Sequence, residues 1–434
     1  MMHTTKKSMA ALLCAAMAAG CSSQAANPSQ SASTRSLQSQ APAESEASST
    51  QSSQVVTTPA SNVNAITELD HLFAFSWDLF NNTRDENDNS ILSPFSAWMA
   101  LGMMANGTGG ETRKQMEDVF GLSIEQINGL ASSALKATSA DEAHTLRLAD
   151  SVWIRASESD SILDSYKNLL AADYQAESFE TDFDDSTKQQ INDWVREHTD
   201  GLIDQMPVDL SPTTMMILLN ALSFDSAWQN EYEDDQIVEE IFHNQNGSEA
   251  SVQMMKSDET QYISSQGLHG FTKLYKGYHY GLTVLIPEGD QSLDEVLHKV
   301  EGVKLLQDLK NPTYSIVHAS FPEFTLSSEQ GLIKPLQKMG LSLPFGDDAD
   351  FSNLSQETGL HVSEIKQKAK IEVSRTGTKA AAATDVGIAG AALTEEEYTI
   401  TCDQPFLYIL SEIETGTPIF IGTVENISDE VTES

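Results

Sequence analysis

Residues 377–395 read Gly-Thr-Lys-Ala-Ala-Ala-Ala-Thr-Asp-Val-Gly-Ile-Ala-Gly-Ala-Ala-Leu-Thr-Glu, and they follow a short strand-like run, Ala369 to Val373. Side chains of a strand point alternately to its two faces. Every second residue from Thr378 to Ile388 is small or β-branched and uncharged, whereas Lys379 and Asp385 fall in the other set. The composition alone indicates a flexible Ala/Gly loop. The alternation indicates a loop that is also able to lie in a sheet as a strand, with its charges on one side.

The segments around this loop predict a mixed domain with a large sheet. Downstream, Phe406 to Leu410 and Pro418 to Val424 flank a Glu-Thr-Gly turn, which predicts a hairpin. Upstream, Thr214 to Phe224 is apolar almost throughout, as expected of a strand that is covered on both faces. Asp70 to Phe80 and Ala97 to Asn106 instead predict helices. Helices dominate the first half and strands the second, so we expect an α+β fold.

The N-terminus is typical of an exported protein. Lys6 and Lys7 precede the apolar run Met9 to Ala19, which is too short to span a membrane. The ending Ala-Ala-Gly-Cys21 resembles a bacterial lipobox, in which the cysteine is lipidated; cleavage nearby by an ordinary signal peptidase is the alternative. Ser22 after the cysteine resembles Gram-negative lipoproteins of the outer membrane. We expect an outer-membrane or cell-surface lipoprotein, or a form released outside the cell, that contacts the membrane only through Cys21.

Composition divides the chain into four parts. Residues 1–20 form the signal peptide, and residues 21–64, rich in Ser, Gln and Ala, predict a disordered tether. Residues 65–427 form one globular domain without a second linker, and residues 428–434 are an acidic tail. Signal cleavage and acylation leave Cys402 as the one free cysteine, so we expect no disulfide and a thiol that is simply packed.

Charge and missing motifs narrow the function. The formal net charge of −39 argues against binding to nucleic acid or to heparin-like polyanions. The sequence has no Gly-rich phosphate loop, no pair of histidines at metal-ligand spacing and no Gly-x-Ser-x-Gly elbow. We therefore expect no metal, no cofactor and no catalytic residue, and an exported hydrolase is the weaker hypothesis.

Motifs in a fixed order along residues 65–427 resemble the serpin family. They are Asn89 with Ser93, Pro94 and Ser96; Ile191-Asn-Asp-Trp-Val195 and Thr199-Asp-Gly201; Asn220-Ala-Leu-Ser-Phe224 with Trp228; Pro322-Glu-Phe324; Cys402-Asp-Gln-Pro-Phe-Leu-Tyr-Ile-Leu410; and Pro418-Ile-Phe-Ile-Gly-Thr-Val-Glu-Asn426. The resemblance implies a fold of three β-sheets with about nine helices and an exposed reactive-centre loop.

The resemblance also implies a function. In a suicide inhibitor of this family, a serine protease attacks the reactive-centre loop and forms an acyl-enzyme. The loop then enters the central sheet as a new strand, and the trapped protease is distorted. The alternative is a non-inhibitory serpin that acts as a binding module or as a protease substrate. Either protein is expected to be a monomer.

By resemblance, site residues fall into three groups. The hinge is Gly377, Thr378, Lys379, Ala380, Ala381, Ala382, Ala383 and Thr384; the shutter is Asn89, Ser93, Pro94, Ser96 and Asn220; the breach is Trp228. Four positions depart from the usual pattern. Arg375 and Thr376 stand where the family commonly has acidic residues, Lys379 replaces a common Glu, and Gln367 replaces a common shutter His. We expect little loss from these changes, because Gln367 still forms hydrogen bonds and the others do not enter the sheet core.

The residues at the cleaved bond determine which class of protease the loop fits. Counting the family's hinge length forward from Arg375 places the reactive bond at Ala391-Ala392, whereas counting back from Pro405 gives Thr394. Leu393 and Thr394 are therefore alternatives. No Arg or Lys lies between Ala380 and Thr401, so a trypsin-like pocket lacks its partner. We predict elastase-like or subtilisin-like serine proteases as targets.

Overall fold

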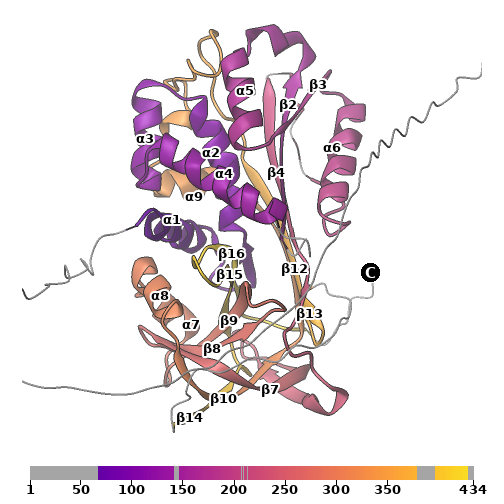
Figure 1. Cartoon of the computed structure of the whole chain (residues 1–434), viewed down its shortest axis with the longest axis vertical. Coiled ribbons are helices and arrows are strands. Elements are labelled where there is room, and N and C mark those ends of the chain that lie inside the picture. The colour runs from indigo at the N-terminus through magenta and orange to yellow at the C-terminus, as the bar shows by residue number, and fades with distance from the viewer. Residues whose placement is uncertain are drawn as a thin grey trace, which may run out of the picture. The chain divides into compact units, whose positions relative to one another are not determined.

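The computed structural model describes residues 67–140, 146–206, 208, 210–212, 214–378 and 396–428 (Figure 1). All of them belong to one compact unit, Val63–Ser434. The expected lipidation site Cys21 lies outside the described residues. So do the hinge residues from Lys379 to Thr384 and the candidate reactive-bond residues Ala391, Ala392, Leu393 and Thr394.

The largest sheet contains most strands of the second half of the chain. Its described strands run in the order β1 (Ser90–Leu92), β16 (Pro418–Val424), β15 (Phe406–Glu412), β9 (Tyr280–Pro287), β8 (Leu268–Leu274), β7 (Glu249–Ser265), β10 (Thr313–Pro322) and β14 (Glu397–Thr401), with β6 (Ile237–His243) also paired to β7. β15 and β16 form the antiparallel hairpin that the sequence predicts.

Two smaller sheets position the loop. One is β3 (Glu177–Thr181), β2 (Leu146–Arg155) and β4 (Met216–Phe224); the other is β11 (Phe324–Gly331), β12 (Lys366–Ser374), β13 (Gly377–Thr378) and β5 (Ser226–Ala227). β4 is buried on both faces along its second half, as its apolar sequence predicts. Among the described residues no ladder joins β4 to β12. β4 and the part of β12 before Val373 therefore each keep an unpaired edge facing the other sheet.

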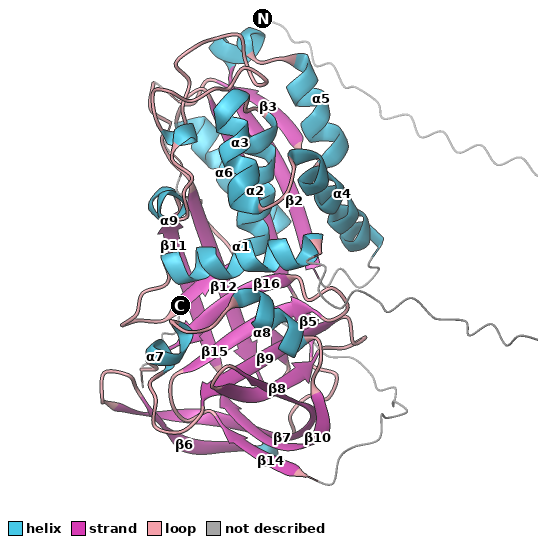
Figure 2. Cartoon of the chain, turned by 90° about the vertical axis from the view of Figure 1, so that its left-hand side faces the viewer, coloured by secondary structure: helices cyan, strands magenta, loops and turns pink. Residues whose placement is uncertain are grey.

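Nine α-helices occur in the described part of the chain: α1 (Glu68–Thr83), α2 (Pro94–Asn106), α3 (Gly110–Phe120), α4 (Ile124–Ala140), α5 (Asp164–Asp173), α6 (Asp185–His198), α7 (Leu293–Leu297), α8 (Gly302–Leu309) and α9 (Ile333–Lys338). Short 3-10 turns occupy Ala156–Ser161, Asp234–Gln236 and Leu343–Phe345. Figure 2 shows α1 between the helices α2 and α3 and the strands of the large sheet. None of the helices in the described ranges has the length and apolar character needed to cross a bilayer. The three sheets and nine helices confirm the expected architecture.

Helix α2 is placed by its first residues. Ser93 caps it, because its Oγ accepts a hydrogen bond from the backbone N–H of Ser96, and Pro94 occupies the first turn, where a missing N–H costs nothing. Nearly all side chains of α2 are buried, which is the pattern of a central helix. The helix lies under β4, with which it makes extensive contact.

The two faces of the β2–β4 sheet pack against different cores. On one face, Leu218 and Leu222 of β4 join the main hydrophobic core with α2. On the other face, Leu219 and Ala221 pack with Trp194 and its neighbours on α6. This alternation follows from the period of two along a strand. It places Asn220 on the same face as Leu218 and Leu222.

Candidate functional site

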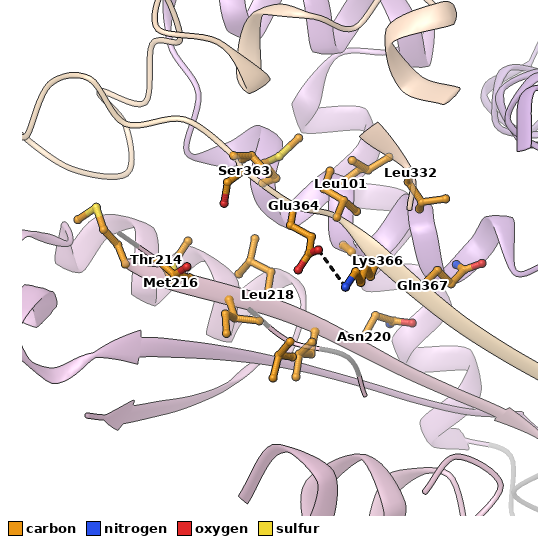
Figure 3. Close-up of a pocket in the computed structure, with 18 of the residues that line it drawn as sticks. Leu101, Thr214, Met216, Leu218, Asn220, Leu332, Ser363, Glu364, Lys366 and Gln367 are labelled. Atoms are coloured by element: carbon orange, nitrogen blue, oxygen red, sulfur yellow. Dashed lines mark ion pairs between the residues drawn. The ribbon is translucent and has the colours of Figure 1, made fainter. Parts of the chain in front are cut away.

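A cleft of about 540 Å³ separates β4 from β12. Met216 to Asn220 of β4 and Lys366 to Lys368 of β12 line its two sides (Figure 3). Ser96, Leu101 and Met104 of α2 contribute to its floor. The lining is largely apolar, and the two strand edges that face each other are unpaired in the described residues. Such an edge is a template for one more strand.

The start of the loop already lies between strands at one end of this arrangement. Gly377 and Thr378 form β13, which pairs antiparallel with Ser374 and Val373 of β12 on one side and with β5 on the other. Gly377 has a φ of 150°, a backbone region that only glycine adopts readily. The sequence motif at the hinge therefore needs glycine at this position.

Thr378 is fixed in a buried polar contact. Thr378 is only 2% exposed. Its hydroxyl shares a hydrogen bond of 2.6 Å with the hydroxyl of Tyr275, the residue directly after β8. Burial raises the pKa of Tyr275 far above its usual range, so the phenol stays neutral and the contact persists at all ordinary pH values. A small residue with one hydroxyl satisfies this site.

Trp228, the predicted breach residue, holds the turn that leads into β13. Its backbone N–H donates to the Thr376 carbonyl at 3.0 Å, and its indole Nε1 donates to the Ser374 carbonyl at 2.8 Å. The indole stacks on Tyr275 at 4.3 Å between ring centroids. Trp228 and Tyr275 therefore form one aromatic platform beneath the hinge.

A buried ion pair that no sequence pattern indicates supports this platform. The Lys273 side chain is 2% exposed, and its Nζ lies 2.8 Å from Glu259 Oε1. The same Nζ lies 4.2 Å from the ring centroid of Tyr232 and 5.5 Å from that of Trp228. Such cation–π contacts, with a charge removed from water, hold the rings in place.

Arg375 is hydrogen-bonded to Glu323, which connects β10 to β11. Its backbone N–H and its Nε both donate to Glu323 Oε1, at 2.8 and 3.2 Å. The Arg375 carbonyl accepts from the backbone N–H of Tyr232 at 3.0 Å. Arg375, which departs from the family pattern, thus has a hydrogen-bonded partner in Glu323 just before β13 begins. Glu323 belongs to the Pro-Glu-Phe motif, which gives that motif a physical role.

The shutter residues Ser93 and Gln367 meet directly. The Ser93 backbone N–H donates to Gln367 Oε1 at 2.9 Å, and Gln367 Nε2 donates to the Ser93 carbonyl at 2.7 Å. Ser93 Oγ also donates to the Ile419 carbonyl of β16 at 2.9 Å. These bonds tie β12 to the start of α2 and to the large sheet. Gln367 therefore satisfies the position where the family commonly has a histidine.

The remaining shutter residues lie in separate contacts. Asn89 binds the chain after β16: its Oδ1 accepts from the backbone N–H groups of Glu425 and Asn426 at 2.7 and 2.9 Å. Asn220 instead faces β2, where its Nδ2 donates to Asp150 Oδ1 at 3.0 Å. Pro94 is buried in the first turn of α2. The five predicted residues are therefore three local groups around α2 rather than a single cluster.

Asp150 and Cys402 are among the buried groups whose pKa is strongly shifted. Burial raises the pKa of Asp150 to about 7, although the hydrogen bond from Asn220 lowers it. Burial also raises the pKa of the Cys402 thiol well above its usual range, which makes it a poor nucleophile. Cys402 is thus a packed residue, as expected. Asp150 was missed, although it falls in the same alternating set as the apolar residues Leu146, Leu148, Val152 and Ile154 of β2, where a carboxyl is out of place.

One group of side chains in the described residues has the spacing of metal ligands. Glu86, Asp294 and His298 bring their ligand atoms within 4.8 Å of one another. The Asp294 carboxylate already pairs with the guanidinium of Arg84, a positive charge that opposes a second cation. The group does not line the cleft, and we assign it no role in this site.

Comparison with known proteins identifies the architecture. The sequence profile of the Serpin family, described as serine protease inhibitor, matches residues 70–427. Serpin-ZX of Arabidopsis thaliana is 30% identical over 367 residues, which cover 79% of this chain and 93% of that protein. An uncharacterized serpin-like protein of Thermococcus kodakarensis is 28% identical over 365 residues, 82% of this chain and 85% of that protein.

A solved structure matches the same region. The native state of the thermophilic serpin tengpin superposes with a TM-score of 0.75 at 33% identity, covering 85% of this chain and 96% of that one. The matched profile spans the cleft, the hinge and the platform described above. The chain belongs to the serpin family, whose members act in general on serine proteases, and it has the serpin fold.

Proposed function

We propose that this protein is a suicide inhibitor of elastase-like or subtilisin-like serine proteases, and that its cleaved loop enters the cleft between β4 and β12. The observation that carries the proposal is β13: Gly377 and Thr378 already pair with β12 at the point where the two sheets meet. Extension of β13 beyond Thr378 continues an existing antiparallel strand along an unpaired edge. The sequence alternation then places Ala380, Ala382 and Thr384 on the face of Thr378.

The energy of such an insertion is large. Each new backbone hydrogen bond contributes about 1 kcal/mol net, so a strand of a dozen residues contributes on the order of 10 kcal/mol. That is comparable with the whole stability of a domain. A driving force of this size is sufficient to distort a protease that remains covalently attached to the loop. The inhibitor itself is consumed in the reaction, so it is not an enzyme.

Target class follows from the loop sequence. Residues 380–401 contain neither Arg nor Lys, and the candidate reactive-bond residues Ala391, Ala392, Leu393 and Thr394 are small or apolar. Elastase-like and subtilisin-like pockets accept such side chains, whereas a trypsin pocket needs a cation. We infer an exported location from the same sequence, with Cys21 as the lipid anchor at the outer membrane or cell surface.

The first prediction concerns the protease partner. The mature chain, mixed with elastase, subtilisin or trypsin, is expected to form complexes that survive SDS with elastase or subtilisin but not with trypsin. Mass spectrometry of the released peptide is expected to place the new N-terminus at Ala392 or within the next three residues. Each protease with its active-site serine blocked is the control and is expected to give no complex.

Two outcomes would overturn the proposal. Complexes with trypsin alone contradict the target class. Cleavage of the loop by every protease without any stable complex supports the alternative, a non-inhibitory serpin that is a substrate.

A further inference from the structure

Asp150 and Asn220 form a buried cross-strand pair behind the edge of the cleft. They are direct partners in the antiparallel register of β2 and β4. Asp150 is 2% exposed and Asn220 is 9% exposed. Asn220 lines the cleft (Figure 3). Its Nδ2 donates to Asp150 Oδ1 at 3.0 Å. One side chain, that of Asn220, therefore joins Asp150 to the edge of the cleft.

The hydrogen bonds of the pair are incomplete if Asp150 is charged. Asp150 Oδ2 and Asn220 Oδ1 are both buried, and neither has a hydrogen-bond partner among the described residues. Both atoms are acceptors, and a carboxylate offers no donor. Protonation of Asp150 supplies one O–H group, which is able to donate to Asn220 Oδ1. The two side chains then form a reciprocal acid–amide pair that satisfies both oxygens.

No described cation offsets a charge on Asp150. From α5 and its end, Tyr166 and Tyr174 point to the same core, and their hydroxyls donate to the Met103 carbonyl at 3.0 Å and to Asn128 Oδ1 at 2.9 Å. Helix α2 contains no ionisable residue. On the other side of the cleft, Lys366 pairs with Glu364 at 3.0 Å, and Lys368 shares its face of β12, opposite to Gln367. His361 lines the cleft beyond them.

The pKa of Asp150 agrees with the burial and the missing hydrogen bond of its carboxyl group. The pKa of Asp150 is raised to about 7 by burial, and its one opposing contribution is the Asn220 hydrogen bond. The unperturbed pKa of an Asp is about 3.9, so the folded protein binds more protons here than the unfolded chain between about pH 4 and 7. Stability from this group is thus fully present below about pH 4 and is lost as the pH rises through 7.

We propose that Asp150 is a positioning residue for loop insertion that acts through Asn220 and makes insertion faster in its protonated state than in its ionised state. The proposal rests on the proposed function. An inserted strand fills the cleft and places uncharged side chains next to Asn220. This removes the remaining solvation of a charge on Asp150, so the inserted form binds the proton more tightly than the open form. Insertion therefore takes up a proton above neutral pH and is slowed there.

The test follows insertion after the loop of the mature chain is nicked by a protease. The rate at which heat resistance appears is measured between about pH 5.5 and 8.5, around the pKa range of a buried carboxyl. In the wild type we expect the rate to fall about tenfold across this range, which corresponds to a shift of about one pKa unit. In Asp150→Asn, which keeps the shape and the pair without the proton, we expect a flat profile.

A second buried carboxyl provides a matched control. Glu425 is 1% exposed, its pKa is also raised to about 7 by burial, and it does not line the cleft. Glu425→Gln is expected to change how global stability depends on pH but to leave the insertion profile unchanged. Asn220→Ala removes the hydrogen bond that lowers the Asp150 pKa. The midpoint of the pH profile of the insertion rate is therefore expected to move to higher pH in this variant.

The outcomes separate this inference from the proposed function. Equal pH profiles in wild type and Asp150→Asn overturn the role of Asp150 while insertion itself stands. An effect of Glu425→Gln as large as that of Asp150→Asn also overturns it, since any buried carboxyl then suffices. If the nicked wild type gains no heat resistance at any pH, the proposed function fails, and the role of Asp150 fails with it.

Discussion

Replacing Thr378 with Arg is expected to convert the proposed inhibitor into a substrate of the same proteases. Thr378 is 2% exposed and lies between β12 and β5, with its hydroxyl bonded to Tyr275. A guanidinium in this site has no anionic partner among the described contacts of Thr378, and burying it costs several kcal/mol. At about 1.4 kcal/mol per factor of ten, we expect insertion to slow by about 100-fold or more.

The measurement counts the two fates of the cleaved loop. Thr378→Arg is incubated with elastase, and the yield of SDS-stable complex is compared with the yield of free, nicked protein. Lys379→Glu is the matched control: it also changes a charge in the hinge, but its position in the alternation predicts the outward face. Trapping by Thr378→Arg at the wild-type yield contradicts the idea that this face enters the sheet.

Replacing Lys273 with Met is expected to destabilise the intact protein by about 3–5 kcal/mol. The aliphatic part of the side chain is kept, but Glu259 is left as a charge in a site where its side chain is only 12% exposed. The cation–π contacts with Tyr232 and Trp228 are also lost, each about 1 kcal/mol. Because Trp228 holds Ser374 and Thr376, the hinge is expected to loosen as well.

Chemical denaturation of the intact protein measures this loss. A second ion pair, between Lys256 of β7 and Glu240 of β6, is partly exposed and serves as a control. Lys256→Met is expected to cost at most about 1 kcal/mol, as exposed pairs do. Adding Glu259→Gln to Lys273→Met is expected to restore most of the lost stability, since no unpaired charge remains. A cost for Lys273→Met no larger than that for Lys256→Met rules out a stabilising role for the pair.

The elements nearest the loop were predictable because their patterns are local. The apolar run of β4, the hairpin of β15 and β16 and the helices α1 and α2 all follow from periodicity within a few residues. Gly377, assigned to the hinge by resemblance, has a φ of 150°, a conformation that glycine adopts readily. Resemblance to a family then ordered these pieces into three sheets, which periodicity alone does not do.

The support of the hinge was not predictable because it joins distant parts of the chain. Tyr275 and Thr378 are 103 positions apart, and Lys273 is paired with Glu259 across neighbouring strands. No local pattern marks such cross-strand register. Asp150 is the exception: a carboxyl in the inward set of an alternating strand was a visible signal. The separate partners of Asn89 and Asn220 likewise depend on register and not on motif spacing.

Melting of the nicked chain against the intact chain tests the central claim most directly. If the loop enters the cleft after cleavage, the nicked protein gains about 10 kcal/mol of hydrogen bonding and is expected to melt on the order of 10 °C higher or more. Nicked Thr378→Arg is expected to show a smaller rise, because burial of the guanidinium offsets part of this gain. A nicked wild-type protein that melts at or below the temperature of the intact protein would contradict the account.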